Sequence, residues 1–298
     1  MRLGCHLKLI EYAGYGSHGT VVLKGSFQGR AVAVKRLLKH FTTIATHEVA
    51  LLQESDEHPN VIRYFCKEQR DNFLYIALEL CPASLADLIE APTAWPDLYA
   101  GFEPKRALKQ IASGLAHLHK LKIVHRDIKP QNILVSPTKP SKKKGEALGP
   151  APVRMLISDF GLCRKLELDE SSFQQTVNHA AGSFGYRAPE VLRGEVNPNE
   201  LSVTPSSSTK SSLLDPSNPT KAPPAAQRLT RSLDIFSLGC IFYYVLTHGD
   251  HPFGSKYERE MNILNRQSCL NKLDDLGEEA HEAQSMIGSM IQDDPTLR

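Results

Sequence analysis

Short apolar runs separated by polar residues dominate the first 80 residues of the chain. The runs that have the length and the β-branched composition of strands occupy residues 21–25, 31–35 and 73–80. Gly29 lies between the first two, where a hairpin turn is expected. Val49 and Leu52 recur at a spacing of three and predict a short helix over residues 46–55. This part of the chain is therefore predicted to form a sheet crossed by one helix.

The pattern becomes helical after residue 105. Leucine and isoleucine recur there at spacings of three and four, which places them on one helical face: Leu108, Ile111, Leu115, Leu118 and Leu121. Residues 137–152 and 193–228 are instead rich in Pro, Ser, Thr, Lys and Gly, and bury too little apolar area to offset the entropy of ordering. We expect both to be disordered surface insertions. For the basic run at 139–144, a solvated loop is favoured over a nucleic-acid or localisation patch.

Composition narrows the class of protein. The chain has 298 residues, 41% of them hydrophobic, which excludes wholesale disorder and allows one large domain or two average ones. A net charge of +2 is too small to hold the chain to nucleic acid or lipid chiefly by charge. Six scattered cysteines without a CxxC pair favour isolated thiols in a reducing compartment. No apolar run approaches the roughly 20 residues of a membrane helix, so we expect no bilayer-spanning segment.

A glycine-rich pattern lies near the start of the chain. Gly14, Gly16 and Gly19 form GxGxxG, and Val21 follows. A dinucleotide-binding loop has the same pattern but opens a helix, whereas here the sequence continues as a hairpin, and no Walker lysine follows. Glycines in a β-turn let backbone amides close over phosphates without side-chain clashes. The pattern therefore predicts a flap over a nucleotide, with Gly14, Gly16, Gly19 and Val21 as nucleotide-binding residues.

Lys35 ends the strand-like run that follows the glycine flap. Taken alone, it is equally well explained as a solvated lysine at the edge of a sheet. Glu48 lies thirteen residues further on, within the predicted helix, and is the candidate ion-pair partner of Lys35. Such a pair would hold the ammonium group against the α- and β-phosphates of the nucleotide.

The most specific motifs are HRDxKxxN at 125–132 and DFG at 159–161. Phosphoryl transfer requires a carboxylate that orients the acceptor hydroxyl, oxygen ligands for Mg²⁺, and cations on the moving phosphoryl group. The side chains predicted for these roles are, in that order, Asp127, then Asn132 and Asp159, then Lys35 and Lys129. A chance match to the ordered set GxGxxGxV, VAVK, HRDxKxxN, DFG and APE is negligible.

This set of motifs resembles that of the eukaryotic protein kinases, from about residue 14 to residue 298. The resemblance implies an α+β fold of two lobes with Mg-ATP bound between them. Residues 1–80 would form the N-lobe of antiparallel strands and one helix, although 1–12 match the family poorly. Residues 81–298 would form the helical C-lobe.

The resemblance also implies further roles. Leu78 would be the gatekeeper, and Glu79 to Cys81 the hinge that bonds adenine through its backbone. Asp234 would brace the catalytic loop, with His125 acting as scaffold rather than as a base. His117 and His119 are expected to be ordinary helix residues.

Residues 159–190 would then be the activation segment, which ends in APE. We predict phosphorylation at Ser171, Ser172 and Thr176, with Arg126 as a cation for the phosphate. A flexible serine-rich loop without phosphate is the alternative. Ser183 is expected to shape the substrate floor, and the resemblance implies that Arg298 pairs with Glu190 of APE.

Longer stretches narrow the resemblance, among them LLQESDEHPNVIRYFCKE, IASGLAHLHKLKIVHRDIKPQNILVS and RSLDIFSLGCIFYYVLTHGDHPFG. They resemble the inositol-requiring transmembrane kinase/endoribonucleases that sense unfolded proteins in the endoplasmic reticulum, and most closely the fungal members. Tyr186 stands where that family carries Trp, and Ala13 where a larger aliphatic residue is expected.

This resemblance implies a Ser/Thr kinase that phosphorylates its own activation segment in trans and forms dimers or higher oligomers. The ribonuclease domain would lie outside this sequence, and RNA would be contacted only through it. The kinase would face the cytosol at the endoplasmic-reticulum membrane, without touching the membrane itself. Two alternatives are a nucleotide-gated oligomerisation scaffold whose kinase chemistry is incidental, and a chain that is inert because its C-lobe is incomplete.

Overall fold

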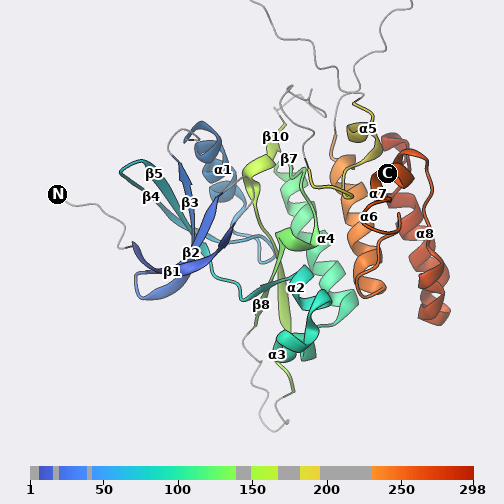
Figure 1. Cartoon of the computed structure of the whole chain (residues 1–298), viewed down its shortest axis with the longest axis horizontal. Coiled ribbons are helices and arrows are strands. Elements are labelled where there is room, and N and C mark those ends of the chain that lie inside the picture. The colour runs from blue at the N-terminus through green and yellow to red at the C-terminus, as the bar shows by residue number, and fades with distance from the viewer. Residues whose placement is uncertain (1–6, 16–19, 39–41, 139–148, 167–181, 195–229) are drawn as a thin grey trace, which may run out of the picture.

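The computed structural model describes residues 7–15, 20–38, 42–138, 149–166, 182–194 and 230–298. Figure 1 shows a sheet and one helix at one end of the molecule and a larger group of helices at the other, the arrangement of a two-lobed α+β fold. The predicted fold class is therefore confirmed.

Five antiparallel strands form the sheet of the N-lobe, in the order β1-β2-β3-β5-β4. They are β1 (Leu7–Tyr15), β2 (Val21–Phe27), β3 (Arg30–Leu38), β4 (Tyr64–Arg70) and β5 (Phe73–Glu79). The tight turn between β2 and β3 places Gln28 and Gly29 at φ values of 51° and 80°, which explains the glycine. All three strand-like runs of the sequence lie in this sheet, whereas β1 and β4 were not predicted as separate strands.

Helix α1 (Thr42–Ser55) packs against the sheet and contains the predicted short helix. Val49 and Leu52 are both buried, which confirms the apolar stripe. Leu51 is buried as well, and the three belong to a core that continues into the C-lobe. Because one core spans both lobes, the position of α1 is coupled to the structure beneath it.

The C-lobe is built mainly from helices. They are α2 (Leu85–Glu90), α3 (Pro96–Ala100), α4 (Pro104–Lys120), α5 (Pro189–Leu192), α6 (Ser232–Leu246), α7 (Arg259–Leu264) and α8 (Ala280–Met290). Short 3₁₀ turns lie at Pro92–Ala94, Pro130–Asn132, Phe160–Leu162, Asn271–Glu279 and Pro295–Leu297. In α4, Glu103 caps the first turn by accepting backbone N–H bonds. The predicted stripe is buried from Leu108 to Leu118, whereas its last member, Leu121, follows the end of the helix and is only partly buried. Apolar α6 is buried along most of its length.

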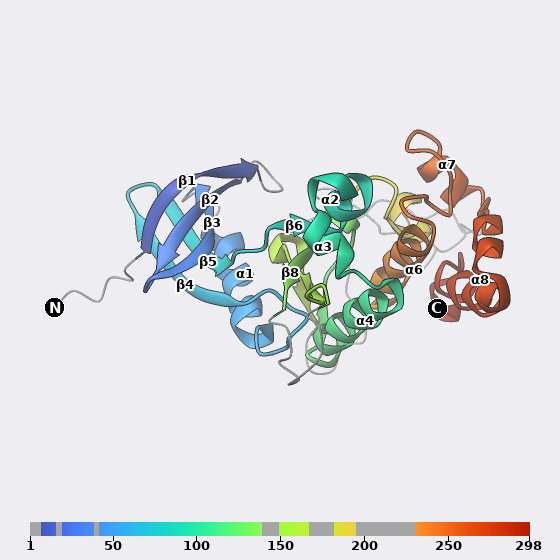
Figure 2. The same ribbon diagram turned by 90° about the horizontal axis from the view of Figure 1, so that it is seen from below.

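Two small sheets lie between the N-lobe and the large helices (Figures 1 and 2). One contains β6 (Ala83–Ser84), β8 (Ile133–Pro137) and β9 (Val153–Ile157), and the other pairs β7 (Ile123–Val124) with β10 (Arg164–Lys165). The loops that leave these strands carry the catalytic motifs. The two sheets therefore fix the floor of the cleft between the lobes.

The loop between α1 and β4 is fastened to β9. The N–H of Ile62 donates to the carbonyl of Ile157, and the N–H of Ile157 donates to the carbonyl of Asn60, both at 2.9 Å. The side chain of Asn60 also donates to the Met155 carbonyl at 2.8 Å. Gly114 of α4 permits this approach, because a Cβ there would lie 2.5 Å from the carbonyl oxygen of Asn60. The C-terminal end of α1 is thus tied to the C-lobe.

The flanks of both predicted insertions are ordered, contrary to expectation. Pro137 belongs to β8, and the N–H of Thr138 donates to the carbonyl of Pro152 at 2.9 Å. Arg193 forms an ion pair with Asp293. Strand pairing and ion pairing, which composition does not reveal, stabilise these flanks. The inner parts of the insertions, 139–148 and 195–228, lie outside the described residues.

Within the described part of the chain, α4 and α6 are too short or too polar to cross a membrane, and no other helix there could do so. The cysteines described there, Cys66, Cys81, Cys163, Cys240 and Cys269, all carry free thiols.

Candidate active site

A cleft of about 1330 Å³ separates the two lobes and is lined by both. The N-lobe side includes Val22, Ala33, Lys35, Glu48, Leu78 and Glu79. The C-lobe side includes Lys129, Asn132, Leu134, Asp159 and Ser183. Apolar side chains from β2, β3, β5 and β8 thus face charged and amide groups within one space, as expected of a site for a flat base with an anionic tail.

The glycine flap is only partly described. Gly14 lies in β1 opposite Val22, while Gly16 and Gly19 lie outside the described residues. Val21 was predicted to contact the nucleotide, but the residue that lines the cleft is Val22. Successive residues of a strand point to opposite faces, so a one-residue difference in register exchanges the two.

Lys35 lies between two carboxylates in the cleft. Its Nζ is 2.7 Å from Oε1 of Glu48 and 3.0 Å from Oδ1 of Asp159. Burial alone would lower the pKa of Lys35, but the two carboxylates outweigh it and raise that pKa above its usual value. The ammonium therefore stays charged, and the alternative of a solvated edge lysine is excluded because only 7% of the residue is exposed.

Asp127 and Asn132 face each other across the catalytic loop. Nδ2 of Asn132 donates to Oδ2 of Asp127 at 2.9 Å and to its carbonyl at 2.8 Å. The amide oxygen of Asn132 is therefore the atom that this side chain can offer to a cation. Nζ of Lys129 lies 3.0 Å from Oδ2 of Asp127, so a cation stands beside the carboxylate.

Ser183 is hydrogen-bonded to both Asp127 and Lys129. From the sequence, Ser183 was expected only to shape the substrate floor. Its hydroxyl donates to Oδ1 of Asp127 at 2.8 Å and accepts a hydrogen bond from Lys129. A serine hydroxyl thus already lies against the carboxylate predicted to orient an acceptor hydroxyl. Ser183 is 56 residues from Asp127 in sequence, so no local pattern could reveal the contact.

Asp234 braces the catalytic loop from α6, as the resemblance implied. Its carboxylate accepts the backbone N–H groups of His125 and Arg126, both at 2.8 Å. It also lies 2.8 Å from Nε2 of His119, which is therefore more than an ordinary helix residue. Burial would raise the pKa of Asp234, but hydrogen bonds from His119 and His125 outweigh it and lower that pKa. Arg126 has a φ of 70°, a strained value that these bonds maintain.

His125 acts as scaffold. Its Nδ1 accepts the N–H of Asp127 at 3.3 Å, which assigns the proton to Nε2, and Nε2 lies 2.9 Å from the Ser158 carbonyl. Its ring meets that of the fully buried Phe160 edge-on, with centroids 5.7 Å apart. Asp159 adopts a left-handed backbone (φ 61°, ψ 80°) between these anchors. That conformation points Phe160 into the core and the Asp159 carboxylate toward Lys35.

The side chains present fit a magnesium ion bound together with phosphates. Mg²⁺ is usually held by one or two carboxylates plus substrate oxygens, rather than by a cage made only of protein. Asp159 supplies a carboxylate and Asn132 an amide oxygen on the same side of the cleft. Among the described residues no cluster of three or more His, Cys, Asp or Glu side chains suits a metal.

The predicted hinge begins at Glu79, the last residue of β5. Leu78, Glu79 and Cys81 all line the cleft, and the Glu79 carboxylate forms an ion pair with Arg154. Burial, with a further contribution from Glu79, raises the pKa of Cys81 to about 12. The hinge thiol is therefore protonated at neutral pH and is a weak nucleophile.

The activation segment is described at its two ends. Arg126 lies close to Arg164, and burial together with this like charge lowers the pKa of Arg126. Two neighbouring guanidinium groups suit a phosphate group. The predicted phosphosites Ser171, Ser172 and Thr176 lie outside the described residues.

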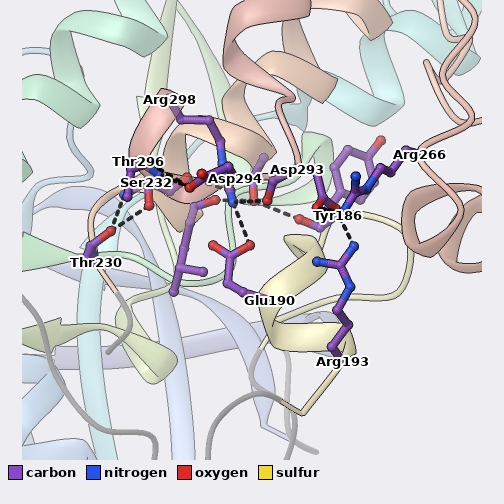
Figure 3. Close-up of polar contacts among 12 residues, drawn as sticks. Tyr186, Glu190, Arg193, Thr230, Ser232, Arg266, Asp293, Asp294, Thr296 and Arg298 are labelled. Carbon is purple, nitrogen blue, oxygen red and sulfur yellow. Dashed lines mark hydrogen bonds and ion pairs between the residues drawn. The ribbon is translucent and has the colours of Figure 1, made fainter. Parts of the chain in front are cut away.

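Glu190 anchors the C-terminal end of the segment (Figure 3). Its Oε2 lies 2.6 Å from Nη2 of Arg298, so the predicted pair is present, and both side chains are almost fully buried. The Arg298 guanidinium also lies over the ring of Phe236, 5.4 Å from its centroid. Nearby, Asp293 pairs with both Arg193 and Arg266. A second cavity of about 750 Å³ lies between α5, α6, α7 and α8, and its lining includes Glu190, Asp293, Arg193 and Arg266.

Comparison with known families agrees with this geometry. The model of the family described as protein kinase domain matches residues 7–203. The chain belongs to the protein kinase family. The match begins at residue 7, within the stretch 1–12 that was predicted to fit poorly, and β1 pairs with β2 from Leu7 onward.

The chain is also similar to named relatives. It is 54% identical over 291 residues to the serine/threonine-protein kinase/endoribonuclease ireA of Aspergillus fumigatus, covering 96% of this chain and 24% of the relative. It is 45% identical to the sensor for unfolded proteins in the ER, ire1, of Schizosaccharomyces pombe, covering 97% and 25%. Human serine/threonine-protein kinase/endoribonuclease IRE2 is 45% identical, covering 97% and 27%. The predicted resemblance to these enzymes is confirmed, and the chain spans about a quarter of their length.

Proposed function

We propose that this chain transfers the γ-phosphate of Mg-ATP to serine and threonine, chiefly on the activation segment of a second copy of itself. The observation that carries the proposal is the convergence of Lys35, Asp159, Asn132 and Asp127 in one cleft. Both the Lys35–Glu48 pair and the inward Asp159 are required for phosphoryl transfer in protein kinases.

Each side chain has one task in this proposal. Lys35, held by Glu48, binds the phosphates, and the hinge from Glu79 to Cys81 binds adenine through its backbone. Asn132 and Asp159 hold Mg²⁺, which when bound neutralises charge on the phosphates. Asp127 orients the acceptor hydroxyl and accepts its proton, and Lys129 stabilises the phosphoryl group in transit.

Autophosphorylation in trans is supported by the position of Ser183. This residue lies near the C-terminal end of the activation segment and against Asp127, so the hydroxyls upstream in the same copy would have to fold back onto their own anchor. A second copy can present its segment without that reversal. Phosphate on Ser171, Ser172 or Thr176 would then have Arg126 and Arg164 as cationic partners.

The relatives' names support a wider role as part of a longer protein. We propose that the full protein is an endoplasmic-reticulum sensor of unfolded proteins whose kinase faces the cytosol. Nucleotide-dependent dimers or higher oligomers of the kinase would activate an attached endoribonuclease that splices messenger RNA. Nucleotide-dependent sedimentation of the purified chain tests the association step.

Replacement of Asp127 tests the catalytic proposal directly. We expect Asp127→Asn to leave Mg-ATP binding largely intact and to reduce transfer from radiolabelled ATP by about 10²- to 10⁴-fold, the usual contribution of such a group. Lys109→Met, an exposed change on α4, is the matched control and should keep full activity. Full autophosphorylation by the Asp127→Asn protein would refute the assigned role.

A further inference from the structure

Strand β9 of the C-lobe carries one side chain that contacts two separate parts of the N-lobe. Val153 and Met155 are buried in the core, so the side chain of Arg154 between them points to the opposite face of the strand. Nη1 of Arg154 donates to the carbonyl of Pro59 at 2.9 Å, and Nη2 forms an ion pair with the carboxylate of Glu79. One guanidinium group therefore joins three segments, namely β9, the loop after α1 and the start of the hinge.

The backbone that carries Arg154 is held firmly within the C-lobe. The N–H of Met155 donates to Oε1 of Gln110 of α4 at 2.7 Å, and the carbonyl of Met155 accepts a hydrogen bond from Asn60 at 2.8 Å. Strand β9 also pairs with β8, where Arg154 lies opposite Ser136. Arg154 therefore extends from an anchored strand, and its two contacts define where the N-lobe lies relative to that strand.

Glu79 is the residue at which the sheet of the N-lobe becomes the hinge. Its N–H donates to the carbonyl of Arg63 at 2.9 Å, and it lies opposite Val32 of β3. Glu79 also lines the cleft, so a shift of this residue moves the wall against which adenine is proposed to bind. The pair with Arg154 is partly buried on both sides, and water and salt screen such a pair less than an exposed one.

The two contacts of Arg154 restrain the motion between the lobes. A guanidinium group is planar and presents its N–H donors in a rigid fork. Rotation of the N-lobe relative to β9 would therefore stretch or bend the contact with Pro59, the contact with Glu79, or both. A cleft must open before a bound nucleotide can leave it, and such opening limits the turnover of many enzymes. The contacts of Arg154 thus oppose the motion that releases the nucleotide.

We propose that Arg154 is a positioning residue that slows the dissociation of the adenine nucleotide, because it holds Glu79 and the loop after α1 against the C-lobe. Arg154 acts through Glu79 and the loop rather than by touching the reacting groups. The inference rests on the proposed function, since it takes the cleft to bind Mg-ATP and to release Mg-ADP, and it deepens that function by naming a residue that sets the release rate.

Stopped-flow fluorescence of mant-ADP with Mg²⁺ measures this rate on the purified chain. We expect Arg154→Met to release mant-ADP about 5- to 10-fold faster than the unaltered chain, the effect of one lost hydrogen bond, with a much smaller change in the association rate. Arg154→Lys keeps a cation beside Glu79 but lacks the fork that holds both acceptors, so its release should be faster by less than about 3-fold. Arg266→Met is the matched control, because it removes an arginine whose ion pair with Asp293 lies outside the cleft, and it should release mant-ADP at the unaltered rate.

A double variant tests whether Arg154 acts through Glu79. Glu79→Gln removes the charge of the partner and should speed release by about 3-fold, since bonds to charged groups are the stronger ones. If the two side chains act as one pair, Arg154→Met/Glu79→Gln should release mant-ADP no more than about 2-fold faster than Arg154→Met alone, whereas independent effects would multiply.

The dependence of autophosphorylation on ATP separates positioning from a folding defect. The ATP concentration that gives half of the maximal initial rate should rise in Arg154→Met by about the factor seen for release, while the maximal rate does not fall. A folding defect would instead lower the maximal rate in proportion to the inactive protein.

The outcomes distinguish this inference from the proposed function. Absence of phosphate transfer by the unaltered chain would refute the proposed function, and absence of mant-ADP binding would refute both. If mant-ADP binds but leaves Arg154→Met as slowly as it leaves the unaltered chain, the role of Arg154 is refuted while the kinase function stands. Multiplying effects in the double variant would refute Glu79 as the residue through which Arg154 acts. Should Arg154→Met fail to fold, Arg154→Lys and Glu79→Gln decide the question, and unchanged release from both would overturn the proposal.

Discussion

Asp159 is both the proposed carboxylate ligand of Mg²⁺ and an ion-pair partner of Lys35. It points toward Lys35 because its own backbone is left-handed and because Phe160 is locked in the core against His125. Loss of the carboxylate removes one oxygen ligand for Mg²⁺ and one partner of Lys35 at the same time. The two losses should be separable by comparing nucleotide binding with and without metal.

We expect Asp159→Ala to weaken binding of Mg-ATP by about 10- to 100-fold or more, the range seen when even outer supports of a metal are removed. Binding of metal-free ATP should change much less, because the substitution also removes the negative charge of the Asp159 carboxylate, which repels the phosphates when no metal lies between them. Isothermal titration calorimetry with magnesium and with a chelator measures both values. An unchanged affinity for Mg-ATP would contradict the ligand role.

His251 is a buried histidine that should make stability depend on pH. It packs edge-on against Tyr186, with centroids 5.0 Å apart, and its Nδ1 accepts the N–H of Phe253 at 3.2 Å. Burial, with a smaller contribution from Arg259, lowers the pKa of His251 to about 3. Between about pH 3 and the unfolded pKa of about 6.5, the unfolded chain binds a proton that the folded chain does not.

Stability should therefore be complete above about pH 6.5 and fall as the pH drops through this window, by up to about 1.4 kcal/mol per pH unit for this one proton. His251→Gln should flatten the dependence of the unfolding free energy on pH between about 4 and 6.5. His281→Gln, at an exposed position of α8, is the control and should leave the slope unchanged. Identical slopes for wild type and His251→Gln would contradict the assignment.

At the scale of elements, α6 holds the catalytic loop through one carboxylate. Asp234 accepts two backbone hydrogen bonds from the loop and a contact from His119 of α4, so it joins three segments. An amide in its place has only one acceptor oxygen and presents hydrogens to the remaining donors.

We expect Asp234→Asn to lower the free energy of unfolding by about 3 kcal/mol, since hydrogen bonds to a charged group contribute about 1.5–3 kcal/mol each. Transfer activity should fall with it, because Asp127 follows the braced residues directly. His119→Gln, which removes one of the three contacts, should cost less than half as much. Urea unfolding of the three proteins checks the order, and a His119 variant as unstable as the Asp234 variant would refute it.

Helices and strands whose apolar residues recur at a regular spacing were predictable from the sequence. The stripe of α4, the β2–β3 hairpin and the strand β5 all have apolar periods that their burial follows. Strand β4 was missed because only one of its seven residues is buried, so its pattern is weak. The insertion flanks were misjudged because they are ordered by pairing that composition does not reveal: Thr138 pairs with Pro152 at the other flank of the same insertion, and Arg193 pairs with the distant Asp293.

Site residues were predictable where a local motif carries them. The motifs alone named Lys35, Glu48, Asp127, Asn132 and Asp159, and these lie together in the cleft. Contacts set by tertiary structure were not predictable, namely Ser183 with Asp127 and His119 with Asp234. Val22 in place of Val21 shows that a motif does not specify which face of a strand turns inward.

The pair Glu190–Arg298 connects distant parts of the whole molecule. It joins the end of the activation segment to the last residue of this sequence, 108 positions away, in an almost fully buried setting. Burying one charge without its partner is far more costly than replacing both with apolar groups.

Arg298→Met should therefore lower the free energy of unfolding by about 3–5 kcal/mol, because Glu190 would be left buried and unpaired. The double variant Glu190→Leu/Arg298→Met should recover most of that loss. The exposed pair of Lys105 and Glu279 offers the control, and Lys105→Met should change stability little. Chemical denaturation measures all four proteins. A double variant no more stable than Arg298→Met would contradict the account.

The fastening of the loop after α1 to β9 has a mechanical consequence. Glu48 lies seven residues before the end of the helix, or about 10 Å along its axis at 1.5 Å per residue. If the fixed end serves as a pivot, a swing of about 20° displaces Glu48 by about 3.5 Å, enough to separate it from Lys35. The helix would then act as a lever, because a displacement of its N-terminal end would carry Glu48 away from Lys35.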